Sequence, residues 1–257
     1  MPHKTKSTSI NYKGFTLIEL SIALTIMGVL AAVVMTGKTV YKQAQLRNVS
    51  STFTKYETAA TAFKIQFNSL PGDTTIAHRN WDDGANGVCG TATQCNGNGN
   101  GTIEYNADGN DNEFYRGMQH LFLADLLPDY FSGVGNIGVI GTNVGKAHGN
   151  NGAIALGSGV LYSSTTFNLF TIAGVKSSAV GSTDWPRDGI FTALDAESIE
   201  NKIDDGLPGT GKIITARGWP IDSENGRCVD QSILTVTNAV NWVFSDKTES
   251  CRIFLKL

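Results

Sequence analysis

The sequence has little excess charge of either sign. Its 257 residues include 20 Lys and Arg against 23 Asp and Glu, a formal net charge of −3. Without a basic excess, charge does not indicate binding to nucleic acid or to an anionic membrane surface, so we expect no nucleic-acid partner. A content of 41% hydrophobic and 17% charged residues is that of an ordinary folded chain with enough apolar material for a core.

The sequence also lacks complete catalytic and nucleotide-binding motifs. Residues 206–213 nearly match a phosphate-binding loop, but Ile213 replaces the hydroxyl that binds magnesium, and a strand-like run follows. Residues 133–138 match a dinucleotide-binding pattern without the strand before it and the helix after it that this site needs. With no nucleophile elbow or metalloprotease helix either, we expect no enzymatic activity.

Histidine is scarce, and the acidic residues form only short pairs. Three of the four histidines, His78, His120 and His148, are dispersed without zinc-ligand spacing, and we interpret them as surface or loop residues. The acid pairs at 82–83 and 204–205 each precede a glycine, which is typical of turns.

Only four cysteines are present, all far from the N-terminus of a chain that begins with an export-like segment. An oxidising compartment favours disulfides over metal-bound thiolates. Of the three possible pairings we predict the local one, Cys89 with Cys95 and Cys228 with Cys251, in which the second bond holds the C-terminal strand.

One long apolar run, from Phe15 to Val34, follows a polar N-terminal segment. Twenty helical residues at ~1.5 Å each span roughly 30 Å, the hydrocarbon thickness of a bilayer. The run is longer than that of a secretory signal, and no small-x-small cleavage site follows it. We therefore predict a membrane-spanning helix, in which Glu19 is the one carboxylate that a plain anchor does not explain.

The residues at the start of this run, Lys-Gly-Phe-Thr-Leu-Ile-Glu-Leu at 13–20, resemble the processing site of type IV prepilins and type II secretion pseudopilins. The resemblance implies that a prepilin peptidase cuts after Gly14 and methylates the new N-terminal residue, Phe15. It also implies a single-pass inner-membrane protein with a periplasmic head. The further partners would be other pilin subunits, in a homo- or hetero-filament, and the filament assembly platform.

Glu19 has a role that follows from its depth in the apolar run. A charged carboxylate in hydrocarbon costs a few kcal/mol unless it is paired. The Phe15 ammonium of an adjacent subunit can pair with it, so we expect Glu19 to set the register of assembly. The competing interpretation is a carboxylate that is protonated or reaches the membrane interface.

The rest of the chain predicts an α+β fold. Apolar residues spaced by three and four along 46–67 continue the membrane helix as an amphipathic half, so one helix is expected over 15–68, ended by Pro71 and Gly72. The expected organisation is a leader at 1–14, a membrane and assembly helix at 15–36, the amphipathic half at 37–68 and a globular head at 69–257.

Within the head we expect an antiparallel sheet packed on the helix and joined by long Gly/Asn-rich loops. Residues 133–159 are expected to be a glycine-rich segment. Helices are predicted at 113–127 and 195–203, and strands at 153–162, 167–175, 212–216, 232–237 and 252–257.

The segment Asn-Gly-Asn-Gly-Asn-Gly at 96–101 places side-chain oxygens at alternate positions, like the start of a calcium loop. The candidate calcium ligands are Glu104, Asp108, Asp111 and Glu113. Against calcium, the alternating residues are neutral and Ala107 occupies the position where the loop needs an acid, so a turn-forming Asn-Gly loop is the alternative. The family resemblance supports calcium only in that some pseudopilins bind it in a head loop.

The predicted function is a structural subunit of a type IV pilus or a type II secretion pseudopilus. Its chemistry would be assembly, through burial of the apolar helix in a filament. The alternative is a minor pilin whose loop-rich head binds a surface, DNA or a secreted substrate.

Overall fold

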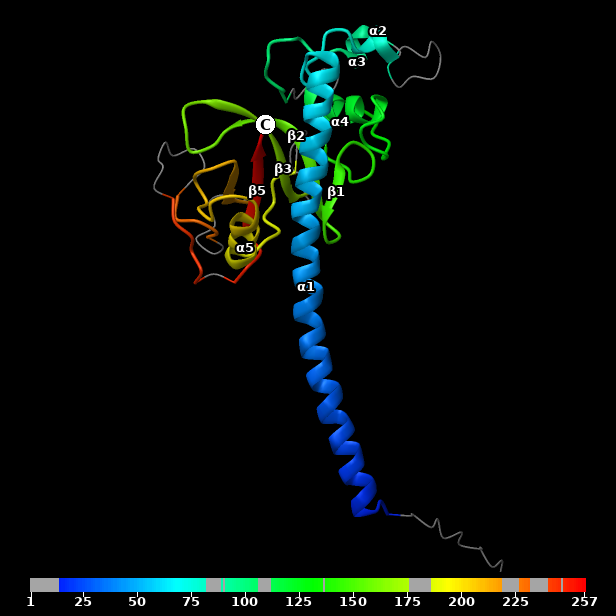
Figure 1. The fold of residues 1–257 in the computed structure, drawn as a ribbon, viewed down its shortest axis with the longest axis vertical. Helices are drawn as coiled ribbons and strands as arrows, with labels where there is room; N and C mark the ends of the chain where they lie inside the picture. Colours follow the sequence, from blue (N-terminus) through cyan, green and yellow to red (C-terminus); the bar gives the residue numbers. More distant parts are fainter. Residues whose placement is uncertain are drawn as a thin grey trace, which may run out of the picture. The chain divides into compact units, whose positions relative to one another are not determined.

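The computed structural model describes residues 14–81, 89, 91–105, 112–135, 137–175, 186–218, 227–231, 240–245 and 247–257 (Figure 1). The chain divides into two compact units, Met1–Ala44 and Gln45–Leu257. A long helix, α1 (Leu17–Phe67), precedes a five-stranded antiparallel sheet, which confirms the predicted α+β class. Most of the leader, the strand predicted at 232–237, the acid pair at 82–83, and Asp108 and Asp111 lie outside the described residues.

Helix α1 ends where its sequence predicts. Asn68 takes a positive φ of 51°, and a turn follows in which the Asp73 N–H donates to the Leu70 carbonyl at 3.2 Å. Gly72 has a φ of +94°, and a Cβ there would lie 2.5 Å from the Glu113 carbonyl oxygen. A residue with a side chain would therefore be both strained and obstructed at this turn.

The second half of α1 packs on the sheet of its own unit through the predicted apolar stripe. The buried apolar residues are Val49, Phe53, Tyr56, Ala59, Ala60 and Phe63. The Tyr56 ring meets Phe170 edge to face, with centroids 5.6 Å apart. The spacing of three and four thus gives the face that joins the helix to the core.

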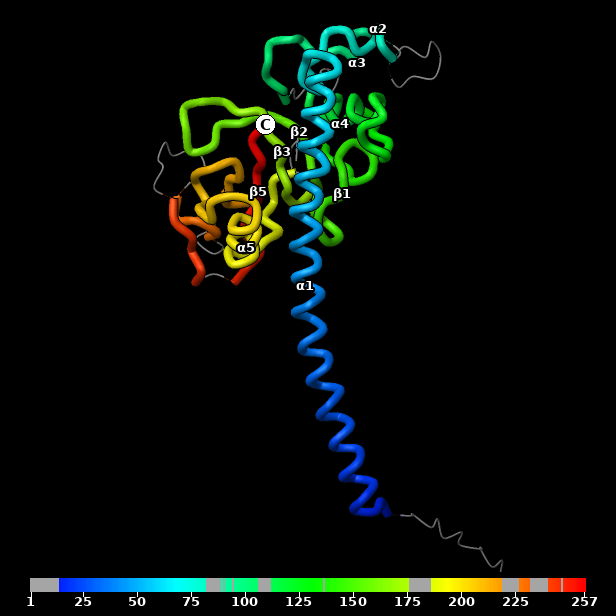
Figure 2. Tube along the Cα trace, viewed as in Figure 1, coloured from blue at the N-terminus to red at the C-terminus, as the bar shows by residue number. Residues whose placement is uncertain are grey.

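The sheet has the order β1-β2-β3-β5-β4, with every neighbouring pair antiparallel. The strands are β1 (Gly145–His148), β2 (Gly152–Val160), β3 (Thr166–Gly174), β4 (Ile213–Arg217) and β5 (Cys251–Lys256). The C-terminal strand is therefore an interior strand, as its red trace beside β3 shows in Figure 2.

Strand β1 lies within the stretch 133–159 that we expected to be a glycine-rich segment. At Gly145 this strand lies close to the second half of α1. A Cβ on Gly145 would lie 2.1 Å from the Tyr56 hydroxyl and 2.8 Å from Ile154 Cγ2, so glycine is what lets this strand pass under α1. That requirement comes from tertiary contact, which local strand propensity does not report.

The head helices differ from prediction mainly at their ends. Helix α4 (Glu113–Leu123) stops before the predicted 127 because Asp125 takes a φ of 57° and the N–H groups of Leu126 and Leu127 both donate to the Leu121 carbonyl. Helix α5 (Ala193–Ile203) begins with a capping box formed by Thr192 and Asp195. The short helices α2 (Ala77–Trp81) and α3 (Ala92–Cys95) were not predicted.

The four cysteines form two disulfides, Cys89 with Cys95 and Cys228 with Cys251. Cys251 begins β5, so the second bond attaches residues 227–231 to the sheet. We expect peptide mapping of the folded protein without reductant to recover both cross-linked peptides, because both bonds lie in a buried part of the head. A parallel digest after reduction is the control, and alkylation of a free thiol in the folded protein would contradict the pairing.

Candidate functional site

The residues around the predicted cleavage position form a short segment before α1. Gly14 is exposed, and a Cβ built on it would meet nothing within 4 Å. Phe15 is 90% exposed. The peptide bond between them is therefore open to another molecule in the single chain.

Glu19 takes part in a capping box at the first turn of α1. Its Oε2 accepts hydrogen bonds from the Thr16 N–H at 2.8 Å and from the Thr16 hydroxyl at 2.7 Å, while Thr16 Oγ1 accepts from the Glu19 N–H at 3.3 Å. These reciprocal bonds satisfy groups that a helix start leaves unpaired. Thr16 was not among the predicted site residues, although Thr-x-x-Glu before an apolar run is a recognised signal for this motif.

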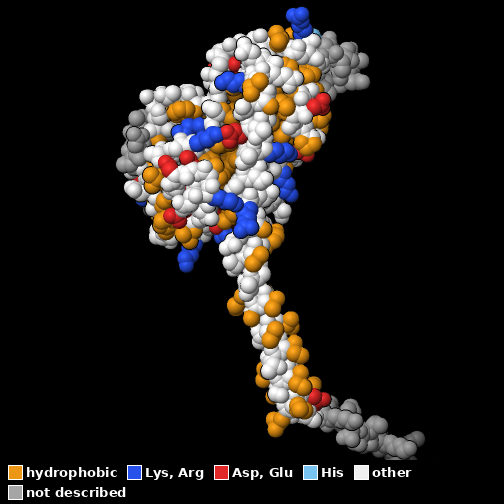
Figure 3. All heavy atoms as spheres, in the orientation of Figure 1, with side chains coloured by type: hydrophobic (Ala, Val, Ile, Leu, Met, Phe, Trp, Pro, Cys, Tyr) orange, Lys and Arg blue, Asp and Glu red, His pale blue; other side chains and the backbone are white. Residues whose placement is uncertain are grey.

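The first half of α1 presents apolar side chains all round. Every residue from 14 to 44 is exposed. Figure 3 shows these hydrophobic side chains along the helix. In the described part of the chain, α1 is the one helix long and apolar enough to cross a membrane. A helix apolar on every side needs either lipid or other apolar helices around it.

In the head, two carboxylates hold the Asn-Gly loop in place. Asp73 accepts backbone N–H bonds from Asn100 at 3.0 Å and Gly101 at 2.9 Å. Glu113 accepts them from Asn98 at 2.8 Å and Glu104 at 2.9 Å. Sequence reasoning did not connect Asp73 with this loop, because 27 residues separate it from Asn100.

The asparagines of the loop also bond locally. Asn98 Oδ1 accepts the N–H of Asn100 at 2.9 Å, and Asn100 Oδ1 accepts that of Thr102 at 2.8 Å. These are side-chain turns of the kind that explain alternating Asn-Gly without a metal.

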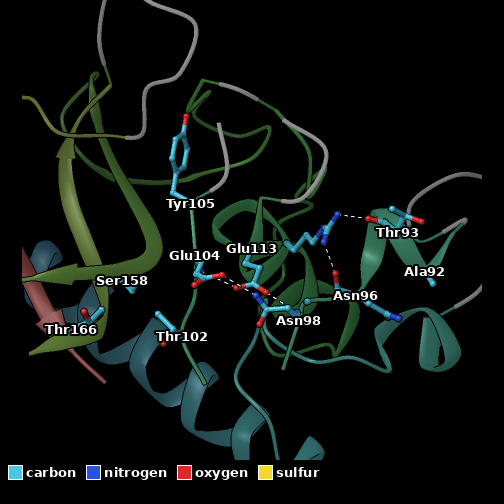
Figure 4. A pocket seen from close by; sticks show the side chains of 12 residues that line it. Ala92, Thr93, Asn96, Asn98, Thr102, Glu104, Tyr105, Glu113, Ser158 and Thr166 are labelled. Atoms are coloured by element: carbon cyan, nitrogen blue, oxygen red, sulfur yellow. Dashed lines mark hydrogen bonds between the residues drawn. The ribbon is translucent and has the colours of Figure 1, made fainter. Parts of the chain in front are cut away.

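A polar cavity of about 920 Å³ lies beside this loop. Figure 4 shows Asn98, Glu104 and Glu113 close together in its wall, where the Asn98 amide donates to Glu104 Oε2 at 2.8 Å. Burial is the main cause that raises the pKa of Glu113. The structure thus brings together two of the four candidate calcium ligands, Glu104 and Glu113, and calcium at this loop stays a prediction.

His120 is a buried residue, and our interpretation of it as a surface or loop histidine is wrong. Its Nδ1 accepts the Gly72 N–H at 2.9 Å, and its Nε2 lies 2.9 Å from the Cys95 carbonyl oxygen, where it donates. Burial lowers the pKa of His120 to about 4. The neutral ring therefore joins α4 to the turn after α1 and to the Cys89–Cys95 segment, a role that sequence spacing did not signal.

A family model, the prokaryotic N-terminal methylation motif, matches residues 10–35. The match includes the predicted cleavage position, Thr16 and Glu19, and stops within the apolar half of α1. No curated protein and no solved structure matches the chain.

Proposed function

We propose that this chain, which carries the N-terminal methylation motif that is the hallmark of type IV pilins and pseudopilins, is a structural subunit of a filament assembled from the inner membrane. The observation that carries the proposal is the apolar half of α1, which is exposed on every side and begins within that motif. Lipid would cover this surface in the precursor, and neighbouring helices would cover it in the filament. Assembly of this kind needs no catalytic residue in the chain.

The partners follow from the same segment. A prepilin peptidase would cleave the exposed bond after Gly14 and methylate Phe15, and the assembly platform would then move the helix out of the membrane. In the filament, the Phe15 ammonium of one subunit would pair with the Glu19 carboxylate of another, because an unpaired charge is poorly tolerated among apolar helices.

A minor pilin with a binding head is the second candidate. It is favoured by the polar cavity beside the Asn-Gly loop, whose wall offers amide, carboxylate and hydroxyl groups to a ligand. The two candidates share processing and membrane insertion. They differ in the number of copies of the chain that each filament contains.

We expect filaments sheared from cells to contain this chain as residues 15–257 with one added methyl group, because cleavage at Gly14 leaves Phe15 as the methylated N-terminus. Intact-mass spectrometry of the sheared fraction measures this, and cells without prepilin peptidase, which should retain the leader, are the control. A dominant band would indicate the major subunit and a trace band a minor one. A chain that starts beyond Val34, that retains Met1, or that is absent from the filaments would contradict the proposal.

A further inference from the structure

The end of α5 and the loop after it bring three carboxyl groups together in the head. Glu200, Asp204 and Asp205 each place one oxygen within 4.8 Å of the others. Glu200 lies in the last turns of α5, and the two aspartates follow the helix directly. The spacing of the aspartate pair is typical of a turn, and nothing in it connects the two residues with a buried glutamate.

Glu200 is the residue that makes this more than a surface cluster. Its side chain is completely buried. Oε1 accepts the Thr215 hydroxyl at 2.9 Å, but Oε2 has no hydrogen-bond partner among the described residues. A buried carboxylate oxygen left unpaired is costly, so it requires a proton or a cation.

The two aspartates are held in position by the loop that joins α5 to β4. Asp204 Oδ2 accepts backbone N–H bonds from Lys212 and Ile213. Asp205 accepts the Leu207 N–H at 2.9 Å and the Thr210 hydroxyl at 2.6 Å. These bonds fix where the two carboxyl groups point.

The nearby lysines are engaged elsewhere. Lys212 forms a salt bridge with Glu57, and the Lys256 ammonium lies 5.0 Å from the centre of the Phe167 ring. In the part of the chain that the structure describes, neither ammonium group forms a salt bridge with the three acids. Burial, followed by the charges of Asp204 and Asp205, raises the pKa of Glu200 to about 8, and these effects outweigh the Thr215 hydrogen bond and the more distant charge of Lys256, which lower it.

We infer that Glu200, Asp204 and Asp205 form a binding site for a divalent cation, with calcium as the ion that fits best. Calcium binds oxygen ligands at about 2.3–2.6 Å, and an ion centred among three oxygens at the largest allowed spacing, 4.8 Å, would lie about 2.8 Å from each, so a small side-chain adjustment brings all three acids to one ion. Magnesium holds its ligands at about 2.0–2.1 Å in a stricter octahedron, which suits this spacing less well. The cation would neutralise Glu200 and join α5 to the start of β4.

The test is a calorimetric titration of the full chain in detergent micelles, stripped with chelator, with CaCl₂ and separately with MgCl₂. We expect one calcium per chain, bound more tightly than magnesium. Glu200→Gln and Asp205→Asn should each raise the calcium Kd by about tenfold or more, since affinity follows the number of charged ligands. Asp205→Asn tests the site even if Glu200→Gln folds poorly, because Asp205 is exposed and its substitution should not disturb the core.

A matched control is Glu104→Gln, which alters the other candidate calcium site and should leave the Kd unchanged.

Thermal melts give an independent test, because calcium and the variant should each change Tm in a predicted direction. Without calcium, Glu200→Gln should raise Tm at pH 9 because it removes a buried charge, whereas added calcium should raise Tm in the wild type and not in the variant. The inference is overturned by no heat up to about 10 mM calcium, by equal Kd values in the wild type, Glu200→Gln and Asp205→Asn, or by loss of binding in Glu104→Gln alone. None of these outcomes bears on filament assembly.

Discussion

Glu19→Ala should be inserted and cleaved like the wild-type chain but be lost from filaments. Insertion should survive because removing a carboxylate makes the segment more apolar. Assembly should fail because the Phe15 ammonium of the adjacent subunit would be left without a partner among apolar helices, and breaking a buried ion pair costs about 3–5 kcal/mol for each contact. The measurements are membrane fractionation, the mass of the processed chain and its amount in sheared filaments.

The capping box supplies the controls that separate charge from local structure. Glu19→Gln keeps an acceptor for the Thr16 N–H and hydroxyl but has no charge, whereas Thr16→Ala keeps the charge and loses the side-chain half of the cap. A lost cap costs about 1 kcal/mol, which is well below the cost of an unpaired charge. If pairing between subunits governs assembly, Glu19→Gln should fail like Glu19→Ala and Thr16→Ala should still assemble.

The opposite pattern, in which Glu19→Gln assembles and Thr16→Ala does not, would make Glu19 a helix cap and not a determinant of register. Wild-type amounts of Glu19→Ala in filaments would contradict both roles.

The buried ring of His120 should make the head less stable in acid. In the folded chain the pKa of His120 is about 4, against an ordinary 6.5. Between these values the unfolded chain binds the proton and the folded chain does not, so this contribution to the free energy of unfolding is complete above pH 6.5 and falls as the pH drops toward 4. The loss amounts to about 3 kcal/mol on the scale of 1.4 kcal/mol per pH unit.

Glu200 changes the free energy of unfolding in the opposite direction over part of the same pH range. Its pKa is raised from 4.5 to about 8 in the folded chain, so in the absence of a cation its contribution falls as the pH rises from 4.5 to 8. The free energy of unfolding of the wild type, measured against pH, would therefore not reveal the contribution of His120 by itself. The informative quantity is the difference between the wild type and His120→Gln, since Glu200 contributes equally to both.

His120→Gln offers an amide oxygen for the Gly72 N–H and an amide N–H for the Cys95 carbonyl, but it does not titrate. We expect it to be less stable than the wild type at pH 7.5 and to lose that disadvantage progressively down to pH 4.5. Urea unfolding of the full chain in micelles at the two pH values measures this. A constant difference between the two proteins would show that His120 is not held neutral by burial.

Features that depend on near neighbours in the chain could be predicted from the sequence. The boundary at Gly14 and Phe15, the apolar run and the stripe that continues it are read from adjacent residues or from a helical period. The end of α1 is of the same kind, because Pro71 and Gly72 act within their own turn. Most strands were located to within a few residues for this reason, and the capping signal of Thr16 and Glu19 was equally available.

Features that depend on which distant surfaces meet were not predictable in this way. The close contact between Gly145 and Tyr56, which accounts for the glycine in β1, exists only in the folded chain. The placement of β5 between β3 and β4 pairs segments that are far apart in sequence. His120 is buried because two loops supply partners for its nitrogens.

The sequence by itself thus determined the N-terminal methylation motif, the membrane-compatible helix and the α+β class, because period and local motifs encode them directly. The tertiary structure alone decided the strand order, the neutral buried histidine and the convergence of Glu200 with Asp204 and Asp205. The burial of a side chain and its distance from other charges depend on three-dimensional packing. Local sequence patterns do not specify which side chains that packing will bury.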